Sequence, residues 1–310
     1  MAKYSLVIHG GAGTILREDM SPKMEADYKR ALQDALDAGF AVLAAGGDSV
    51  GAVLAAVVSL EDNILFNAGR GSVFGKNGLH EMDASIMEGR LLMAGAVSGV
   101  RNIRNPVELA HAVMTRSPHV MLNGQGADDF AKSIGAMTEQ DEYFFSQFRY
   151  DQWKQVQDSD TTALDHNIVL KDKKFGTVGA AACDAQGNIA AATSTGGMTN
   201  KQWGRVGDSS IIGAGTYANN KTCAISCTGH GELFIRAVAA YDVSCLMEYK
   251  GLDLEEAMRF VVQDKLVKIG GEGGMIGTDA NGNTAMLFNS EGMYRGRKDS
   301  AGLNELAIYK

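Results

Sequence analysis

The second half of the chain contains two strand–turn–strand patterns, which constrain the fold more than any other feature. Residues 176–195 place apolar stretches on both sides of an Asp-Ala-Gln-Gly-Asn turn, and residues 273–297 repeat this around Asp-Ala-Asn-Gly-Asn. Such patterns are typical of β-hairpins. Helical patterns at about 231–249 and 253–268 separate them. This order predicts two stacked sheets covered by helices. The matching turns fit an internal duplication or a shared preference for Gly-Asn turns, and we favour the latter.

The first half alternates between strand and helix patterns. Residues 4–9 predict a strand that ends in the glycine loop 9–13. Ser21, followed by proline, is a common helix start, and the helical pattern after it ends at a Gly-Gly pair. Asp48 or Ser49 then caps an almost wholly apolar second helix, which we expect to be buried because it lacks a polar face.

The segment from residue 138 to residue 174 differs from both halves. It begins as a polar helix dotted with aromatic residues and then becomes a stretch of mixed charge without a clear period. Low hydrophobicity without a period is typical of a linker, and we predict a mobile linker at about 155–176. An apolar strand begins directly after it, at Thr177.

The composition argues against several classes of partner. The 310 residues carry a net charge of −8 with both signs interspersed, whereas nucleic acids and anionic membranes need a concentrated basic patch. We therefore expect neither partner. No apolar run approaches the roughly 20 residues of a membrane span, and the N-terminal apolar run is too short for a signal peptide. We expect a cytoplasmic protein.

The four cysteines are too few for a disulfide scaffold, and we expect reduced thiols in a packed interior. Cys223 and Cys227 with His230 are a poor match to a zinc site, because no fourth ligand lies nearby. We expect no cofactor for catalysis.

A serine hydrolase is one interpretation that the motifs allow. Residues 47–51 match the GxSxG nucleophile elbow, and residues 9–13 resemble the oxyanion loop of esterases. An elbow, however, joins a strand to a helix, and the residues before Ser49 have a helical pattern. We therefore interpret Ser49 as a helix cap and keep the serine hydrolase as a rival hypothesis.

The junction between the linker and the next strand indicates a different chemistry. If the bond between Gly176 and Thr177 breaks, Thr177 gains an α-amino group with a pKa of about 8, near the operating pH that suits a general base. One residue then supplies both a hydroxyl nucleophile and its base. Glycine before the bond tolerates the strained backbone that self-attack needs. By itself Gly-Thr is a common pair, and an ordinary strand start also explains it.

Residues further along the chain supply what such a nucleophile needs. The hydroxyl residues 193–195 end the second strand of the hairpin and can lie beside Thr177. Arg205 and Asp208 lie in a glycine-flanked loop and together suit a ligand with an α-carboxylate and an α-ammonium group, although a local ion pair is the alternative. Residues 227–232 join a strand to a helix and offer a hydroxyl and backbone N–H groups for an oxyanion hole.

Taken together, these segments resemble the plant-type asparaginase, or isoaspartyl peptidase, family of N-terminal-nucleophile hydrolases. The matching motifs run in the family's order across nearly the whole chain: IHGGAG, LFNAGRGSVF, EMDASIM, GTVGAAACDAQGN, ATSTGGMTNK, GRVGDS, GAGTYA and CTGHGE. The resemblance implies an α+β fold, a four-layer αββα sandwich of two stacked, mainly antiparallel sheets, as one domain over residues 1–310. It also implies self-cleavage into an α chain, residues 1–176, and a β chain, residues 177–310, with two αβ units pairing as a dimer.

The resemblance assigns a role to each matching site residue. Thr177 is implied as the nucleophile and Thr195 as the threonine that supports it. The implied clamp on the substrate's α-carboxylate and α-amino groups is Arg205 with Asp208. The remaining site positions are Thr228 and Gly229 for the oxyanion hole, Gly231 beside the substrate and Asn67 at the border of the site. The implied activity is hydrolysis of β-aspartyl dipeptides, with L-asparaginase activity on the small amide.

The turn at residues 60–70 resembles the family's sodium-binding loop, in which mostly backbone carbonyls hold the ion. The implied ligands are Leu60, Glu61, Asn63, Phe66, Ala68 and Arg70. A sodium ion at this place would be structural.

The chain departs from the family pattern at a few positions. Gln202, Trp203 and Ser210 stand where family members often carry Leu-Pro and Pro, which concerns the shape of the clamp loop and the substrate preference. Phe175 stands where a small or polar residue is common, which concerns the cleavage rate. We keep as alternatives a glycosylasparaginase, a taspase-like protease, and an unprocessed, inactive homologue that serves as a binding scaffold.

Overall fold

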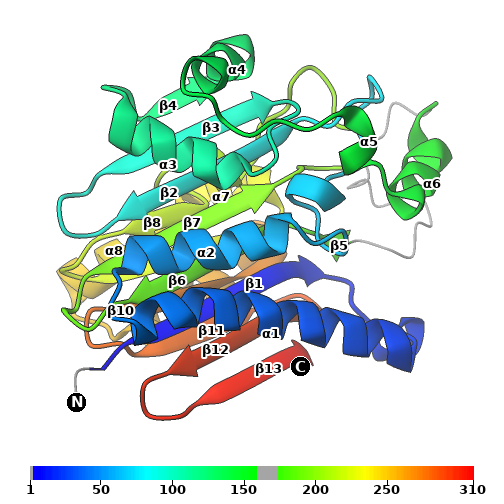
Figure 1. Ribbon diagram of the computed structural model, residues 1–310. Helices are drawn as coiled ribbons and strands as arrows, with labels where there is room; N and C mark the ends of the chain where they lie inside the picture. The colour runs from blue at the N-terminus through cyan, green and yellow to red at the C-terminus, as the bar shows by residue number, and fades with distance from the viewer. Residues whose placement is uncertain (1–2, 159–173) are drawn as a thin grey trace.

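The computed structural model describes residues 3–158 and 174–310, which form a mixed α+β fold with two β-sheets (Figure 1). Most of the linker predicted at about 155–176 lies outside the described residues. Both of its ends have regular structure, because helix α6 (Gln147–Val156) extends two residues into it and strand β5 (Lys174–Phe175), near its other end, pairs with β1 (Ser5–Gly13).

The larger sheet contains nine strands within the described residues, in the order β13-β12-β1-β6-β7-β2-β3-β4, with β5 beside β1. All of its pairs are antiparallel except β3 with β4. Its other strands are β2 (Met82–Glu88), β3 (Ala94–Val100), β4 (Met121–Asn123), β6 (Val178–Cys183), β7 (Ile189–Thr195), β12 (Gly292–Asp299) and β13 (Asn304–Tyr309).

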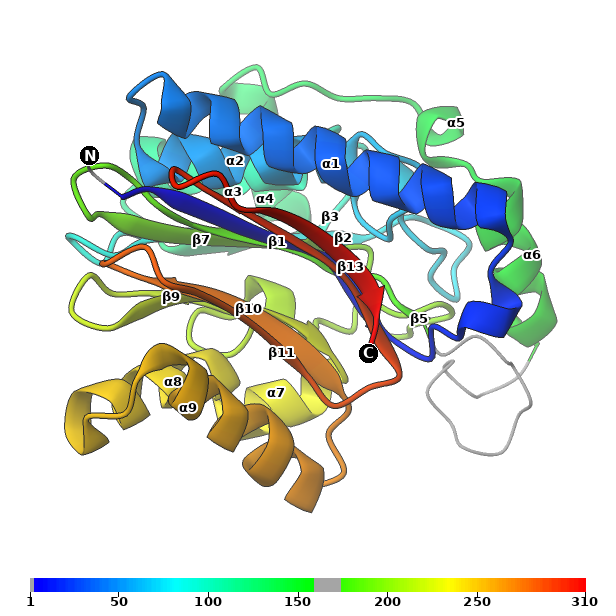
Figure 2. The same cartoon turned by 90° about the horizontal axis from the view of Figure 1, so that it is seen from below.

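The smaller sheet is antiparallel throughout, in the order β11-β10-β9-β8. Its strands are β8 (Thr216–Ala218), β9 (Cys223–Gly229), β10 (Gly273–Asp279) and β11 (Thr284–Phe288). Figure 2 shows the two sheets stacked, with α1, α2 and α3 outside the larger sheet and α7, α8 and α9 outside the smaller one. The helices are α1 (Pro22–Ala44), α2 (Ser49–Glu61), α3 (Pro106–Arg116), α4 (Gly124–Ser133), α5 (Asp141–Phe144), α7 (Gly231–Ala237), α8 (Ala239–Lys250) and α9 (Leu254–Arg259).

Both faces of the central strands are buried, which explains why apolar residues predominate in these strands. Side chains alternate between the two faces of a strand. Leu6 and Ala180 belong to the apolar cluster under the helices of the larger sheet, whereas Val7 and Ala181 belong to the cluster that packs against the smaller sheet. A third cluster lies between the smaller sheet and its own helices. The predicted pair of stacked sheets is confirmed.

The two predicted hairpins are present, and their turns have a common local cause. The Oδ1 of Asp184 accepts hydrogen bonds from the backbone N–H groups two and four residues later, each at 2.9 Å, and Asp279 does the same in the second hairpin. Asp299 makes the same pair of bonds between β12 and β13, where the sequence is Asp-Ser-Ala-Gly-Leu. Glycine with positive φ stands at the fourth position of each turn. A third copy of different sequence favours shared turn chemistry over duplication.

The predicted helix starts are confirmed at three places. Ser21 caps α1, with its side chain accepting from the backbone of Met24. Asp48 caps α2 by accepting from Gly51 N at 2.8 Å, so Ser49 is the first helical residue and not the cap. Asp253 forms a capping box at the start of α9. The apolar helix α2 was expected to be buried all round, and this is confirmed along one side only, because Val50, Leu54 and Val58 on its other side are partly exposed.

Four predicted boundaries were wrong. The glycine loop at 9–13 continues β1, with a bulge between His9 and Ala12. The helix expected after residue 138 is divided into α5 and α6. The helix expected at 231–249 breaks at Val238, whose φ is +51°. The helix expected at 253–268 changes at residue 260 into a π-helical segment, Phe260–Leu266. None of the three changes within helices carries a Gly or Pro signal at the change itself.

Cys183, Cys223 and Cys227 are buried free thiols, as predicted, and Cys245 is partly buried. Within residues 3–158 and 174–310 no helix has the length and apolar character to cross a bilayer.

Candidate active site

Thr177 lies directly before β6, at the start of the central hairpin of the larger sheet. Val178 pairs with Ser194 of β7, which brings Thr195 beside Thr177. The hydroxyl of Thr177 donates to Thr195 Oγ1 at 3.1 Å, and both side chains are buried. Thr195 Oγ1 also accepts from the backbone N–H of Gly197 at 3.0 Å, which sets its orientation. The expected approach of a β7 hydroxyl to Thr177 is confirmed.

Gly176 is packed tightly against Asn67. A Cβ added at position 176 would lie 2.2 Å from the Cβ of Asn67, so only glycine fits there. Asn67 itself is held to the segment after Thr195: its Nδ2 donates to the carbonyl of Gly197 at 2.7 Å, and its carbonyl accepts from Gly196 N at 2.9 Å. Asn67 therefore borders the junction between Gly176 and Thr177.

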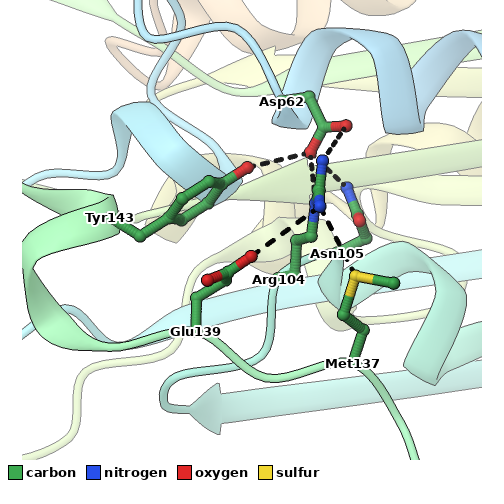
Figure 3. A network of polar contacts seen from close by, with 6 residues as sticks. All are labelled: Asp62, Arg104, Asn105, Met137, Glu139 and Tyr143. Carbon is green, nitrogen blue, oxygen red and sulfur yellow. Dashed lines mark hydrogen bonds and ion pairs between the residues drawn. The ribbon is translucent and has the colours of Figure 1, made fainter.

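The segment that carries Asn67 is anchored at its start by Asp62, at the end of α2 (Figure 3). Asp62 accepts hydrogen bonds from Nε and Nη2 of Arg104, both at 3.2 Å, and from the hydroxyl of Tyr143 at 3.1 Å. Burial acts to raise the pKa of Asp62, but these bonds together with one from Asn105 hold it below its ordinary value. The ion pair with Arg104 thus joins the end of α2 to the start of α3, and the hydrogen bond from Tyr143 joins it to α5.

Arg205 and Asp208 lie in the loop between β7 and β8, on either side of Gly231. A Cβ at Gly231 would lie 2.9 Å from both Arg205 Nη2 and Asp208 Oδ1, so glycine keeps this space open. Arg205 donates through Nε and Nη2 to the two carboxylate oxygens of Glu232, each at 2.8 Å. This bidentate pair fixes the guanidinium plane. Sequence reasoning did not identify Glu232.

The carboxyl group of Asp208 is 3% exposed, and burial raises its pKa to about 7, against the opposing charge of Arg205. Its Oδ2 has no hydrogen-bond partner among the described residues. Thr228, near the end of β9, is similar: its buried Oγ1 also has no partner in the part of the chain that the structure describes. Most buried polar atoms in native proteins have a partner, so these two atoms are available to a ligand, as are other unpartnered buried atoms of the described residues such as Ser210 Oγ.

Gly229 and the residue after it turn the chain from β9 into α7. Gly229 has a φ of +153°, and a Cβ there would lie 2.5 Å from the carbonyl of Glu272. Thr228 is two residues beyond Ser226 and therefore shares its face of β9. Ser226 Oγ lies 2.9 Å from Nε2 of His9, whose Nδ1 lies 3.0 Å from the carbonyl oxygen of Thr177. This connection brings the turn after β9 toward the Thr177 side of the site.

His9 is a site residue that sequence reasoning missed. It is fully buried, and burial lowers its pKa to about 3, although the bond to Thr177 opposes the shift. The ring is therefore neutral at pH 7 and carries one N–H. Because a carbonyl oxygen can only accept, Nδ1 is the protonated nitrogen in that contact. A polar residue in an otherwise apolar strand was the only sequence signal for it.

The serine-elbow interpretation is wrong. Ser49 is the first residue of α2 and follows another helix, α1, so no strand leads into it. Its side chain is 2% exposed. Among the departures from the family pattern, Trp203 is 97% exposed with a φ of +54°, and Ser210 is buried at the end of the short helix Asp208–Ser210.

No cluster of three or more His, Cys, Asp or Glu side chains that could hold a metal occurs among the described residues. The sodium loop expected at 60–70 uses backbone carbonyls and is not addressed by this observation.

A model of the family described as Asparaginase matches residues 2–308, nearly the whole chain. The chain belongs to this asparaginase family. It is 51% identical to the isoaspartyl peptidase of Escherichia coli (strain K12) over 297 residues, which cover 95% of this chain and 92% of the relative. It is 42% identical to the isoaspartyl peptidase/L-asparaginase of Danio rerio over 285 residues, which cover 92% of this chain and 89% of the relative.

Membership of the asparaginase family confirms the resemblance that the ordered motifs indicated. The structure of this family member brings Asn67 to Gly176 and Thr195 to Thr177, and it brings Gly231 between Arg205 and Asp208. The individual catalytic and binding roles of these residues stay predictions.

Proposed function

We propose that this chain is a threonine amidohydrolase that cleaves β-aspartyl dipeptides and also hydrolyses L-asparagine. Relatives over most of its length are named isoaspartyl peptidase and L-asparaginase. One arrangement carries the proposal. Thr177, the residue directly after the bond to Gly176, forms a hydroxyl pair with Thr195. Two buried atoms, Asp208 Oδ2 and Thr228 Oγ1, lack partners among the described residues. A ligand with an ammonium group and an amide carbonyl would satisfy both atoms.

The active form would arise by cleavage between Gly176 and Thr177. In this step the Thr177 hydroxyl attacks the carbonyl carbon of Gly176 and the C–N bond breaks, which leaves an ester on Thr177 Oγ1 and a free α-amino group on Thr177. Water then hydrolyses the ester, which releases the Gly176 carboxylate and restores the Thr177 hydroxyl. The tight contact of Gly176 with Asn67 supports a restrained bond at this position.

The products would be an α chain, residues 1–176, and a β chain, residues 177–310, in a single domain. Strand β1 of the α chain lies between β6 and β12 of the β chain, and β2 pairs with β7. Antiparallel ladders of this length and the shared apolar core support continued association after the cut.

In the proposed reaction, Thr177 Oγ1 attacks the side-chain carbonyl carbon of the aspartyl group, and its proton passes to the α-amino group of Thr177. Negative charge then develops on the carbonyl oxygen, where the Thr228 hydroxyl and the backbone N–H of Gly229 would donate. Collapse of this intermediate expels the amine, which takes the proton from the α-amino group. Water attacks the resulting ester and releases aspartate. Thr195 would hold the nucleophile through the 3.1 Å contact.

Substrate recognition would rest on Arg205 for the α-carboxylate and Asp208 for the α-ammonium group, with Gly231 leaving the space between them. Glu232 supports this assignment, because its bidentate contact orients the guanidinium and leaves Nη1 outside the pair. An ammonium group beside Asp208 would favour the ionised carboxylate, which burial alone disfavours.

The arrangement of helices outside two stacked sheets supports assignment to the four-layer αββα sandwich of N-terminal-nucleophile hydrolases. A dimer of αβ units and a cytoplasmic location belong to the same proposal and rest on the family resemblance. Substrate would be a small amide or dipeptide.

We further propose that the turn at 60–70 holds a structural sodium ion through the carbonyls named above. The turn fits such an ion in one respect: the carbonyls of Leu60, Asn63 and Ala68 each accept a backbone hydrogen bond, and a carbonyl oxygen has a second lone pair to offer. Gly69, with a φ of +50°, lies against the carbonyl of Glu61. An unfolding temperature that rises in NaCl relative to choline chloride at equal ionic strength would support the site; equal temperatures would contradict it.

The function is tested by assaying the purified protein with β-aspartyl-leucine, L-asparagine and glycosylasparagine, alongside a denaturing gel. We expect two bands and hydrolysis of the first two substrates. Thr177→Ala should give one uncut band and no hydrolysis, because it removes the nucleophile of both steps. Ser49→Ala is the matched control and should leave cleavage and activity intact.

Other outcomes identify the alternatives. Preferred hydrolysis of glycosylasparagine would indicate a glycosylasparaginase, and cleavage of a polypeptide in place of dipeptides would indicate a taspase-like protease. An uncut protein that hydrolyses none of them would indicate a binding scaffold. Activity retained in Thr177→Ala would contradict the mechanism outright.

A further inference from the structure

A path of buried hydroxyl groups crosses the space between the two sheets, behind the site. It starts at His9 in β1, whose Nε2 lies 2.9 Å from Ser226 Oγ in β9. Ser226 Oγ lies 2.7 Å from Thr193 Oγ1 in β7, which accepts from Thr216 Oγ1 in β8 at 2.5 Å. All four side chains are fully buried. The path therefore passes back and forth between the larger and the smaller sheet.

The two ends of this path reach two different parts of the site. At one end, His9 Nδ1 contacts the carbonyl oxygen of Thr177 at 3.0 Å. At the other end, Ser85 Oγ in β2 lies 2.8 Å from Thr216 Oγ1 and 2.6 Å from the carbonyl oxygen of Ser209. Ser209 directly follows Asp208. A series of six close polar contacts thus joins the backbone of the proposed nucleophile to the backbone beside the proposed ammonium-binding carboxylate.

Space for this path is kept open by a glycine. A Cβ at Gly179 would lie 2.0 Å from Ser226 Oγ and 2.6 Å from His9 Nε2. Neighbouring positions between the sheets, such as Ala181 and Ala191, are apolar. Apolar side chains of similar volume would serve packing at least as well as buried polar ones, whereas connected hydrogen bonds give rigidity. The path therefore needs an explanation other than packing.

The number of protons on the groups of the path indicates which substitution affects the Thr177 end and which affects the Asp208 end. Neutral His9 and the four hydroxyls supply one proton each, but six contacts lie along the path and the carbonyls at its ends can only accept. The carbonyl of Gly215, 3.3 Å from Thr193 Oγ1, is a further acceptor beside the path. At least one contact along the path therefore carries no proton. Removing the Ser85 hydroxyl leaves a proton for every remaining contact up to Thr177, whereas removing Ser226 takes away the partner of His9 itself.

We propose that Ser226, Thr193, Thr216 and Ser85 are positioning residues, which act on Thr177 through His9 and on the Asp208 segment through Ser209. After cleavage, Thr177 has lost its peptide bond to Gly176, and the bond from His9 to its carbonyl becomes a principal restraint on its backbone. The path holds that backbone at a fixed place relative to the clamp. This inference deepens the proposed function and rests on it.

The test uses fully cleaved enzyme and steady-state kinetics with β-aspartyl-leucine. Ser226→Ala should lower kcat about tenfold with KM within about twofold, because losing one hydrogen bond to a buried partner has roughly this effect on a barrier. Ser85→Ala should raise KM by about fivefold to tenfold and leave kcat within about twofold. The opposite response of kcat and KM is a signature that a general loss of stability does not produce.

Ser244→Ala is the matched control, because Ser244 Oγ and Thr222 Oγ1 form a buried hydroxyl pair at 2.7 Å outside the path. It should lower the unfolding temperature as the other two variants do, with unchanged kinetics. At the middle of the path, Thr193→Val removes the hydroxyl at nearly constant volume and should affect both parameters, whereas Thr193→Ser should restore them.

Two failures can be told apart. If the wild-type protein does not hydrolyse the dipeptide, the proposed function fails. If the wild-type protein is active but Ser226→Ala and Ser85→Ala behave like Ser244→Ala, or Thr193→Val behaves like Thr193→Ser, the positioning proposal is overturned.

Discussion

Asp208 is expected to lower the free energy of unfolding of the protein without substrate. Replacing it should therefore raise that free energy, by an amount that depends on pH. Its carboxyl group is buried, has one oxygen without a partner among the described residues, and has its pKa raised by burial from 3.8 to about 7. Groups that must be charged for binding are often held where charge is unfavourable. Asp208→Asn removes the titrating group at nearly the same volume.

The sign follows from which state holds the proton. Between pH 3.8 and about 7 the folded chain keeps a proton on Asp208 that the unfolded chain releases, so raising the pH through this window favours unfolding. The contribution to stability is complete below pH 3.8 and is lost by about pH 7. At about 1.36 kcal/mol per pH unit, the loss is about 4 kcal/mol for the interval between 3.8 and about 7.

The measurement is the free energy of unfolding in urea between pH 4 and pH 8, for Asp208→Asn and its parent, both in the Thr177→Ala background so that the chain is expected to stay uncut. The variant should gain about 3–4 kcal/mol relative to its parent across this range. Any pH-independent cost of the new amide cancels in this difference. A difference that stays constant with pH would mean that Asp208 is ionised in the folded chain, and the reasoning would be refuted.

The remaining predictions concern packing and capping. Gly179→Ala should destabilise the fold by about 1–3 kcal/mol, because its Cβ would meet Ser226 Oγ at 2.0 Å. The control Gly126→Ala, at an open position in α4, should instead stabilise the fold by about 0.5–1 kcal/mol. Equal free energies of urea unfolding for the two variants would contradict the packing argument. Asp48→Ala should cost about 1 kcal/mol by removing the cap of α2, with unchanged hydrolysis, and an unchanged free energy of unfolding would contradict it.

Features with a cause inside a few residues could be predicted from the sequence. The caps at Ser21, Asp48 and Asp253 and the Asp-led turns depend on side chains that bond their own neighbouring backbone. The break at Val238 could not be predicted in this way. Its left-handed conformation sits between α7 and α8, where Ala240 N and Tyr241 N donate to the loop carbonyls of Ala214 and Gly213. Such a break is decided by contacts distant in sequence.

The residues of the candidate site also fall into those that the sequence could predict and those that depend on contacts distant in sequence. Residue types named Thr177, Arg205 and Asp208 as chemically suited to their task, and the order of the motifs gave them a family. The partners that orient them stayed hidden, because each is distant along the chain: His9 contacts the carbonyl of Thr177 across 168 positions, and Glu232 contacts Arg205 across 27. A histidine in a strand and a glutamate in a helix carry no sign of such a partner.

Two buried polar atoms of the candidate site depart from the rule that such atoms are satisfied. Elsewhere between the sheets, the hydroxyls from Ser226 to Ser85 bond one another, whereas Asp208 Oδ2 and Thr228 Oγ1 find no partner in the part of the chain that the structure describes. Each such atom costs stability, which a substrate bound as proposed above would offset. Burial depends on the whole fold, so no local sequence pattern could have revealed these costs. Other buried side-chain atoms among the described residues, such as Glu61 Oε2 and Ser210 Oγ, also lack a partner. The unsatisfied atoms therefore support the candidate site only together with the contact between Thr177 and Thr195 and the match to the family.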